Sequence, residues 1–151
     1  LSDIYPEVAS MLASNADGTL LEKVAGELNQ LIGSTRRFTD FCVEFAPPPP
    51  EVRPTFAQFE FSGESYRKAM KKIYRYRSHA LHGGKPFPHT MCSEPEEIDD
   101  GLPAEKPNSL AASAMGSTWV ADDLPLYLHT FEYITRNALK RWWATVVPEP
   151  Q

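Results

Sequence analysis

The chain has 151 residues, of which 42% are hydrophobic and 11% aromatic, and this is sufficient to form the core of a globular protein. Its formal net charge of −5 excludes a global electrostatic attraction to nucleic acid or to an anionic membrane. No apolar run reaches the roughly 18 residues that a membrane-spanning helix needs, so we expect no membrane association. We interpret residues 1–151 as one domain. Because the first residue is Leu1 rather than Met, we expect the domain to belong to a longer protein.

The two cysteines, Cys42 and Cys92, are too few to form a disulfide framework. No basic and apolar segment of the kind that directs secretion is recognisable. We therefore interpret both cysteines as free thiols of a cytoplasmic protein, with a single bridge between them as the alternative.

Helical spacing and turn residues predict two helices in the first 32 residues. Ser2 and Asp3 are suited to cap a short helix that ends near Leu12. Residues 15–18 have the composition of a turn. Apolar residues three and four positions apart then predict a second helix over residues 19–32.

This second helix is expected to be capped by Thr19 and to stop at Gly33, because glycine after the last periodic residue is a common helix end. A separate short helix is predicted over residues 34–45. Its apolar residues recur at helical spacing and are Phe38, Phe41, Cys42 and Phe45.

Four prolines at residues 47–50 predict a stiff connector, which in the polyproline II conformation extends about 3.1 Å per residue. The alternative is a ligand segment for a partner domain with an aromatic groove. Three phenylalanines follow, and we interpret them as core residues rather than as a stacking platform: Phe56, Phe59 and Phe61.

The most informative stretch is a helix predicted over residues 66–85. Its apolar and half-apolar residues follow one stripe and are Tyr66, Met70, Ile73, Tyr74, Ala80 and Leu81. Gly83 and Gly84 predict its end, and Ser62 or Ser65 is suited to its N-terminal cap.

The same stretch carries seven of the 15 lysines and arginines, whereas residues 94–105 carry six acidic residues and no basic one. A basic face opposite an apolar stripe is most often a solvated surface. The alternative is that the acidic segment covers it, and we predict that residues 94–105 lie across the helix and inhibit it.

Residues 86–123 form a long segment with several prolines and little periodicity, which predicts a loop with a short helix around residues 109–115. Asp122 or Asp123 is suited to cap a last helix. The apolar stripe of that helix is predicted to consist of Leu124, Leu128, Phe131, Ile134 or Thr135, Ala138, Trp142 and Val146.

Strand alternation is weak throughout, and no internal repeat is recognisable. The sequence therefore predicts an all-α fold, an antiparallel bundle of about five helices with a long acidic, proline-containing loop before the last helix. Trp142 and Trp143 point to different faces of this helix, so one of them is available to a partner surface.

The central helix contains an arginine and a histidine separated by four residues. On an ideal helix Arg77 and His82 lie about 140° apart, so they do not form a pair on one face. They converge only if the last turn unwinds at Gly83, if both side chains reach into a cleft, or if a second copy of the helix supplies the missing partner.

Residues 74–84 read YRYRSHALHGG, which resembles the signature of the HEPN superfamily, an arginine followed by a histidine at a helix end. The tyrosine, serine and glycine pair around it are most similar to the Apea-like HEPN branch. Residues 133–143, which read YITRNALKRWW, resemble the last helix of that branch. The resemblance covers residues 66–85 and 124–146.

The resemblance implies a metal-independent endoribonuclease whose cleft forms between the protomers of a homodimer. His82 is the expected acid and base, because histidine exchanges protons near neutral pH. Arg77 is expected to stabilise the phosphate charge. Ser78 departs from the Asn, Asp or His usual at the family's variable polar position, and His79 is an accessory candidate. RNA supplies its own 2′-hydroxyl nucleophile, so we expect no metal and no other cofactor.

The expected partner is RNA, whose backbone Lys72, Arg75 and Lys85 are predicted to hold in a salt-sensitive way. The toxin, phage-defence and RNA-processing contexts of the family imply an antitoxin or a fused partner domain.

Three alternatives remain open on the sequence. The first is a non-catalytic HEPN-like module that binds RNA or protein. The second is a structural role, in which Arg77 and His82 form a buried polar pair or His82 acts as a cation on the helix dipole. The third is a zinc site built from two closely spaced pairs, His79 with His82 and His89 with Cys92.

Overall fold

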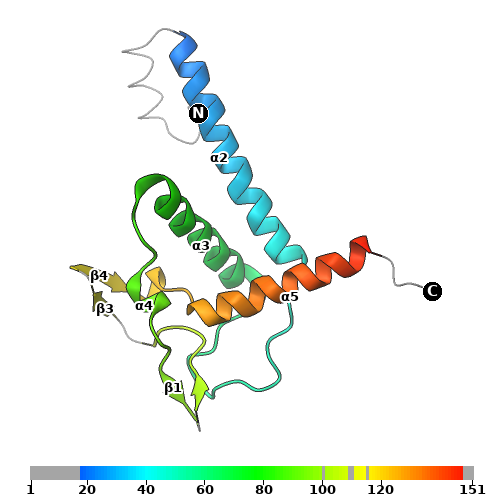
Figure 1. Cartoon of the computed structure of the whole chain (residues 1–151), viewed down its shortest axis with the longest axis vertical. Helices are drawn as coiled ribbons and strands as arrows, with labels where there is room; N and C mark the ends of the chain where they lie inside the picture. Colours follow the sequence, from blue (N-terminus) through cyan, green and yellow to red (C-terminus); the bar gives the residue numbers. More distant parts are fainter. Residues whose placement is uncertain (1–17, 100, 109–110, 115, 148–151) are drawn as a thin grey trace. The chain divides into compact units, whose positions relative to one another are not determined.

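The computed structural model describes residues 18–99, 101–108, 111–114 and 116–147, and in this part the chain is mainly helical (Figure 1). The contacts divide the chain into two compact units, Leu1–Arg37 and Phe38–Gln151, while the prediction of one domain over residues 1–151 stays a prediction. The helix predicted to end near Leu12 lies outside the described residues. No helix in the described part is both long and apolar enough to cross a membrane.

The first described element is α2 (Gly18–Glu44), a single helix of 27 residues. The predicted stop at Gly33 and the separate helix over residues 34–45 were therefore wrong. Glycine ends a helix when it adopts a left-handed conformation, and Gly33 does not have a positive φ. Inside a helix, glycine costs only about 1 kcal/mol relative to alanine, so the strong helical pattern on both sides prevails.

The core of the second unit joins α2, α3 (Gly63–Gly83), α4 (His89–Cys92) and α5 (Leu128–Val146). Its buried residues are Cys42, Phe59, Phe61, Tyr66, Ala69, Met70, Ile73, Tyr76, Met91, Leu124, Leu126 and Ile134. The hydroxyl of Tyr66 on α3 donates a hydrogen bond to the carbonyl of Cys42 on α2, at 3.0 Å. Burial raises the pKa of the Cys42 thiol to about 11, which keeps it protonated, whereas the free thiol of Cys92 is exposed.

The connector between α2 and α3 contains no helix or strand. Phe59 and Phe61 are buried as predicted, but Phe56 is 48% exposed and was wrongly assigned to the core. Ala57, Phe59 and Phe61 are buried while Gln58 and Glu60 are exposed. From Gln58 to Phe61 this alternation is that of an extended segment with one face on the core. Ala57 has a left-handed φ of 53°, so Phe56 precedes this segment and does not share its core face.

The loop after α3 contains two short antiparallel hairpins, which the prediction of an all-α fold did not include, although the described part is mainly helical as predicted. In the first, β1 (Glu97–Ile98) pairs with β2 (Leu102–Pro103), and in the second, β3 (Ala111–Ala114) pairs with β4 (Ser117–Val120). Gly101 and Gly116 have φ values of 88° and 76° and permit the tight turns. Strands of two to four residues are too short to show an alternating pattern.

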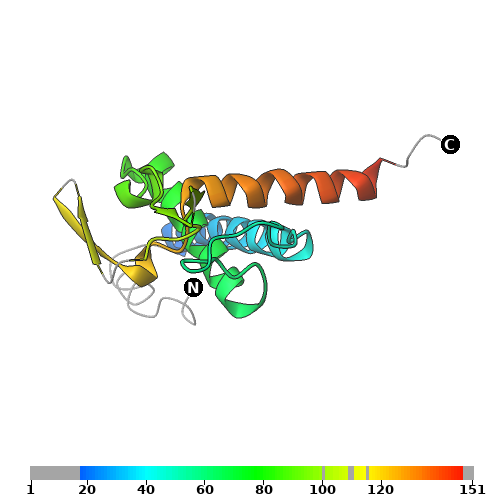
Figure 2. The same ribbon diagram turned by 90° about the horizontal axis from the view of Figure 1, so that it is seen from below.

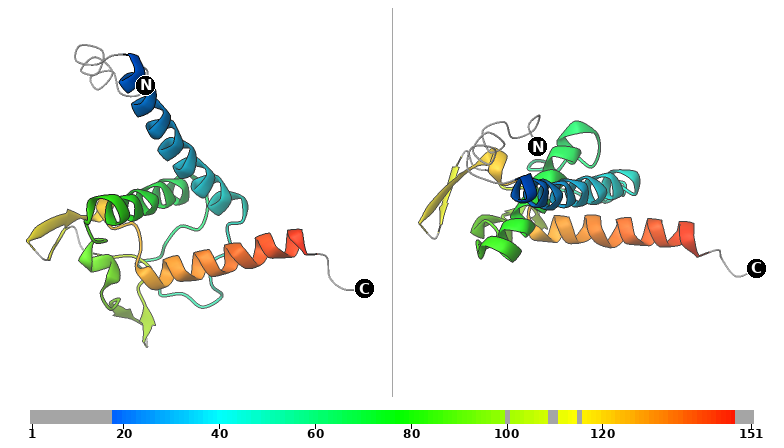
Figure 3. Two further views of the ribbon diagram at one scale, coloured as in Figure 1. Left: turned by 45° about the horizontal axis from the view of Figure 1, so that its top comes forward. Right: turned by 90° about the horizontal axis from the view of Figure 1, so that it is seen from above.

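The second hairpin replaces the helix predicted around residues 109–115, since β3 pairs in register from Ala111 opposite Val120 to Ala114 opposite Ser117. This hairpin projects outward from near one end of α3 (Figure 3). Trp119 of β4 contacts Tyr76 of α3, and their ring centroids are 6.2 Å apart.

The last helix, α5, begins at Leu128 rather than after Asp122 or Asp123. These aspartates lie in a 3₁₀ turn, η1 (Ala121–Asp123). Pro125 explains the delay, because a residue that precedes proline is disfavoured in helical conformation, and Leu124 has φ −116° and ψ 71°. The buried residues of α5 are Thr130, Ile134 and Ala138, and the helix continues well beyond them (Figure 2).

Candidate functional site

The predicted site lies on the last two turns of α3, where Arg77, His79 and His82 are exposed and Ser78 is half-buried. The helix is regular through Gly83 and ends at Gly84, which adopts a left-handed conformation with φ 62°. The carbonyl of His79 accepts the N–H of Gly84, so the last turn does not unwind at Gly83. Arg77 and His82 therefore stay about 140° apart around the helix axis.

Arg77 contacts an aromatic side chain on its own helix face. Its guanidinium carbon lies 5.6 Å from the centroid of the Tyr74 ring, and that ring in turn contacts Phe38 on α2 with centroids 5.3 Å apart. Such an exposed cation–π contact contributes about 0.5–1 kcal/mol, which is enough to favour this side-chain conformation of Arg77 but not to hold the side chain in it. One chain thus does not bring Arg77 and His82 to a common point.

His82 shares its helix face with a different set of cations. The residues of this face recur three and four positions apart, are all exposed, and form what we call the basic stripe: Lys68, Lys71, Arg75, His79 and His82. Arg75 lies about 20° around the axis and about 10.5 Å along it from His82. Within the described part of the chain, no carboxylate forms an ion pair with the basic stripe.

Two of the three residues predicted to hold the RNA backbone are accessible. Arg75 and Lys85 are exposed. Lys72 instead fastens η1 to α3, since its ammonium donates to the Asp122 carbonyl and lies 3.2 Å from the Asp123 carboxylate. Lys72 is therefore better explained as a structural residue.

The acidic segment does not lie across α3 as predicted. Among the described residues, the ion pairs of α3 are Arg67 with Asp40 and Lys72 with Asp123. The segment instead contacts the connector, where Asp99 accepts a hydrogen bond from the Thr55 N–H at 2.6 Å. Hydrogen bonding from the side chain and the backbone of Thr55 lowers the pKa of this aspartate. Buried Glu105 pairs with Arg53. The expectation failed because it used net charge alone, whereas Asp99 and Glu105 have partners on the connector.

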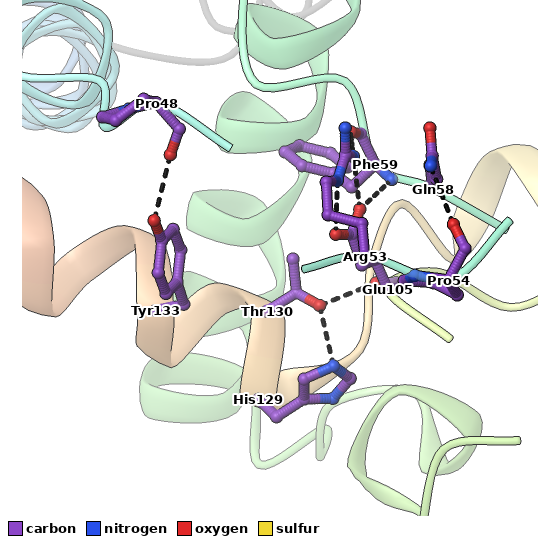
Figure 4. Close-up of polar contacts among 9 residues, drawn as sticks. All are labelled: Pro48, Arg53, Pro54, Gln58, Phe59, Glu105, His129, Thr130 and Tyr133. Carbon is purple, nitrogen blue, oxygen red and sulfur yellow. Dashed lines mark hydrogen bonds and ion pairs between the residues drawn. The ribbon is translucent and has the colours of Figure 1, made fainter. Parts of the chain in front are cut away.

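Glu105 is the centre of a polar network that the sequence did not indicate (Figure 4). Its carboxylate accepts two bonds from the Arg53 guanidinium, at 2.8 and 2.6 Å, and one from the Phe59 N–H at 2.5 Å. Its carbonyl accepts bonds from the Tyr127 N–H and the Thr130 hydroxyl. Glu105 thus joins the connector, the acidic segment and the start of α5, and we interpret it as structural.

His129 lies next to this network and was not singled out by the sequence. Its ring stacks on Tyr127. Its Nε2 lies 3.1 Å from the Thr130 hydroxyl (Figure 4). Because Thr130 donates its one hydroxyl hydrogen to Glu105, Nε2 has to be the donor to Thr130. The neutral ring then carries its hydrogen on Nε2, and the buried Nδ1 has no partner within the described residues.

The stability of the protein is expected to fall as the pH drops below about 6.5, in part because of His129. Burial lowers the pKa of His129, although the carboxylates of Glu105 and Glu132 oppose the effect. The unfolded chain then binds a proton that the folded chain does not, and this favours unfolding until the pH falls below the folded pKa. Urea titrations at neutral and acidic pH measure the change in the free energy of unfolding.

The His129→Gln variant is expected to show a smaller loss of stability on acidification than the wild type. The His89→Gln variant, which removes an exposed histidine, is the matched control. Equal pH dependence in all three proteins would remove His129 from the explanation.

Two other candidate sites receive no support from the geometry. No three His, Cys, Asp or Glu residues of the described part lie close enough to hold a metal ion, so His79, His82, His89 and Cys92 do not form the alternative zinc site. A surface hollow of about 680 Å³ is lined by residues of the connector and α5, among them Pro48, Arg53 and Arg141. The predicted catalytic residues do not line it.

Comparison of the chain with models of protein families, with curated proteins and with solved structures found no match. The description of the candidate site therefore rests on the residues of this chain alone. Arg77 and His82 are exposed on separate faces at the end of α3, and the basic stripe runs along the His82 face.

Proposed function

We propose that the chain is a metal-independent endoribonuclease of the HEPN type, which cleaves RNA at a cleft between two copies. The observation that carries the proposal is the exposure of both Arg77 and His82 at the end of one regular helix. Exposed side chains on different faces are unsuited to a buried structural pair. A pair of copies related by a twofold axis overcomes the separation of the two side chains, because Arg77 of one copy then approaches His82 of the other.

In the proposed reaction, the RNA 2′-hydroxyl attacks the adjacent phosphorus. His82 takes the hydroxyl proton and returns a proton to the leaving 5′-oxygen. As the new bond between the 2′-oxygen and phosphorus forms, the bond to the 5′-oxygen breaks, which leaves a 2′,3′-cyclic phosphate and a 5′-hydroxyl. Arg77 stabilises the extra negative charge on the phosphate oxygens.

The other residues have supporting roles in this proposal. Ser78 and His79 lie between the two catalytic residues and are candidates for contacts to the substrate. Arg75 and Lys85 are exposed and hold the RNA backbone, with Lys68 and Lys71 of the basic stripe as additions. Phosphate contacts of this kind make binding weaken steeply with salt.

The proposal includes an antiparallel bundle of about five helices, a homodimer, a cytoplasmic location and an antitoxin or fused partner domain. The mainly helical character of the described residues is consistent with such a bundle.

The test uses two RNA substrates that differ at one atom. The protein is expected to cleave an RNA oligonucleotide in the presence of EDTA, and to leave intact the same oligonucleotide with a single 2′-deoxynucleotide at the cleavage position. Mass spectrometry of the products should identify the cyclic phosphate. Cleavage of the deoxy substrate at the same bond, or complete inhibition by EDTA, contradicts the mechanism.

The alternative is a non-catalytic HEPN-like module that binds RNA or protein. One observation favours it, because Arg77 contacts the Tyr74 ring on a face away from His82. A dimer that binds RNA in a salt-dependent way, without cleaving any RNA supplied, would identify this function instead.

A further inference from the structure

The C-terminal part of α5 continues past the core of the second unit. Ala138 is the last buried residue of α5, and each residue from Leu139 to Val147 is exposed. A helix segment that is solvated on all sides is normally polar. The composition of this segment is different, and it identifies a surface that the proposed nuclease site does not use.

Four large apolar residues cover one side of this segment. They recur at three and four positions and form what we call the α5 apolar stripe: Leu139, Trp142, Trp143 and Val146. Leu139, Trp143 and Val146 are 52%, 58% and 55% exposed. The Trp142 ring contacts Trp143 and the edge of Phe41, with centroid distances of 6.2 and 6.4 Å. A contiguous exposed patch with two tryptophans is typical of a binding surface.

The charges beside the stripe all have the same sign. After Glu132, α5 contains no acidic residue, and its charged residues are Arg136, Lys140 and Arg141. On an ideal helix Arg136 and Lys140 lie about 60° and 100° from Leu139, at one edge of the stripe, while Arg141 lies about 200° away on the opposite face. Arg136 pairs with the exposed Glu132. Lys140 forms no ion pair with the described residues.

We propose that the α5 apolar stripe binds an acidic amphipathic helix of a partner protein. Leucines at i, i+3, i+4 and i+7 of such a helix pack between Leu139, Trp143 and Val146. Carboxylates that flank those leucines then reach Lys140 and Arg136. The complementarity of charge selects an acidic helix over a basic one, and the tryptophans provide the anchors.

The charge of the chain disfavours the two other occupants. A second copy that pairs its α5 with this one brings like charges together at Arg136 and Lys140. Recruitment to an anionic membrane usually takes a cluster of about four or more lysines and arginines, whereas this edge of the stripe offers Arg136 and Lys140.

The test measures binding of the full chain to a fluorescein-labelled synthetic helix by anisotropy. The probe has leucines at i, i+3, i+4 and i+7 and glutamates on both flanks, and the control probe has lysines in place of the glutamates. We expect the acidic probe alone to bind, and more weakly as salt increases. Trp143→Ala and Lys140→Glu should each weaken binding about tenfold or more. Arg141→Glu, a charge reversal on the opposite face, should change it less than about twofold.

Circular dichroism is the control for folding, and we expect the variants to keep their helices because Trp143 and Lys140 are exposed. Several results overturn the proposal. They are failure of the folded chain to bind the acidic probe, equal binding of both probes, and equal effects of Lys140→Glu and Arg141→Glu. A dimer that Trp143→Ala dissociates would identify a second copy as the occupant, and vesicle binding that Trp143→Ala abolishes would identify a membrane.

Discussion

A co-expressed mixture of the Arg77→Ala and His82→Ala variants is expected to cleave RNA at about a quarter of the wild-type rate, while each variant alone loses at least ~10²-fold. In a twofold dimer, each site takes Arg77 from one copy and His82 from the other. A dimer of one variant with the other therefore contains one site without either residue and one complete site. Random assembly makes about half of the dimers mixed, and half of their sites intact, so about a quarter of all sites are active.

The complementation experiment distinguishes a site shared between two copies from a site within one chain. If both residues act in the same protomer, the mixture stays as inactive as its components. Arg75 makes a sharper comparison, because it shares the helix face of His82. If Arg75 were the true cation and acted within its own chain, Arg75→Ala would abolish cleavage, and its mixture with His82→Ala would remain inactive.

Matched controls exclude loss of fold or of the dimer. All variants alter exposed residues, so their helical signal and sedimentation should match the wild type. Lys71→Ala on the basic stripe should weaken RNA binding and lower its salt dependence, with the maximal cleavage rate unchanged. Folded, dimeric single variants that retain cleavage would remove Arg77 and His82 from the mechanism.

The Glu105→Ala variant is expected to lose about 3 kcal/mol or more of its free energy of unfolding. The substitution leaves the half-buried Arg53 without its carboxylate and the Phe59 N–H without its acceptor. An unpaired cation in such a place costs far more than an exposed one. Urea denaturation followed by circular dichroism measures the change.

A second ion pair provides the matched control. Glu132 and Arg136 lie one turn apart on α5 and are both exposed, so Glu132→Ala should cost less than about 0.5 kcal/mol. The Arg53→Met and Glu105→Gln double variant should be more stable than the sum of the single effects predicts, because neither charge is then left alone. Equal losses of unfolding free energy for Glu105→Ala and Glu132→Ala would show that the Glu105 network does not stabilise the fold more than an exposed ion pair does.

The helices were predictable where the signal is local. The helix α3 begins within three residues of the predicted start, and it ends at the glycine pair because Gly84 adopts the left-handed conformation that favours glycine. Ile134 and Ala138 of α5 are buried as their spacing predicted. Leu128 and Val146 fit the same pattern but are exposed, since periodicity gives the apolar side of a helix and not the extent of its contacts.

The features that sequence reasoning missed depend on residues far apart in the chain. Arg53 and Glu105 are separated by 52 positions, and a pattern within one segment does not indicate that they meet. His129 was passed over for the same reason, because its tautomer follows from Thr130 and from the Glu105 carbonyl. Arg77 and His82 lie at the C-terminal end of a helix, as the sequence predicted. The contact of Lys72 with the turn η1 could not be predicted, because the turn itself was not.

The dependence of the second unit on α5 has a consequence for synthesis on the ribosome. Ile134 belongs to the same buried cluster as Phe59 and Tyr66, and the Tyr133 hydroxyl donates to the carbonyl of Pro48, 85 positions earlier. Phe59 and Phe61 therefore remain uncovered in the nascent polypeptide until α5 has left the exit tunnel. Chaperones that bind apolar segments during translation are expected to act on this segment mainly in that interval.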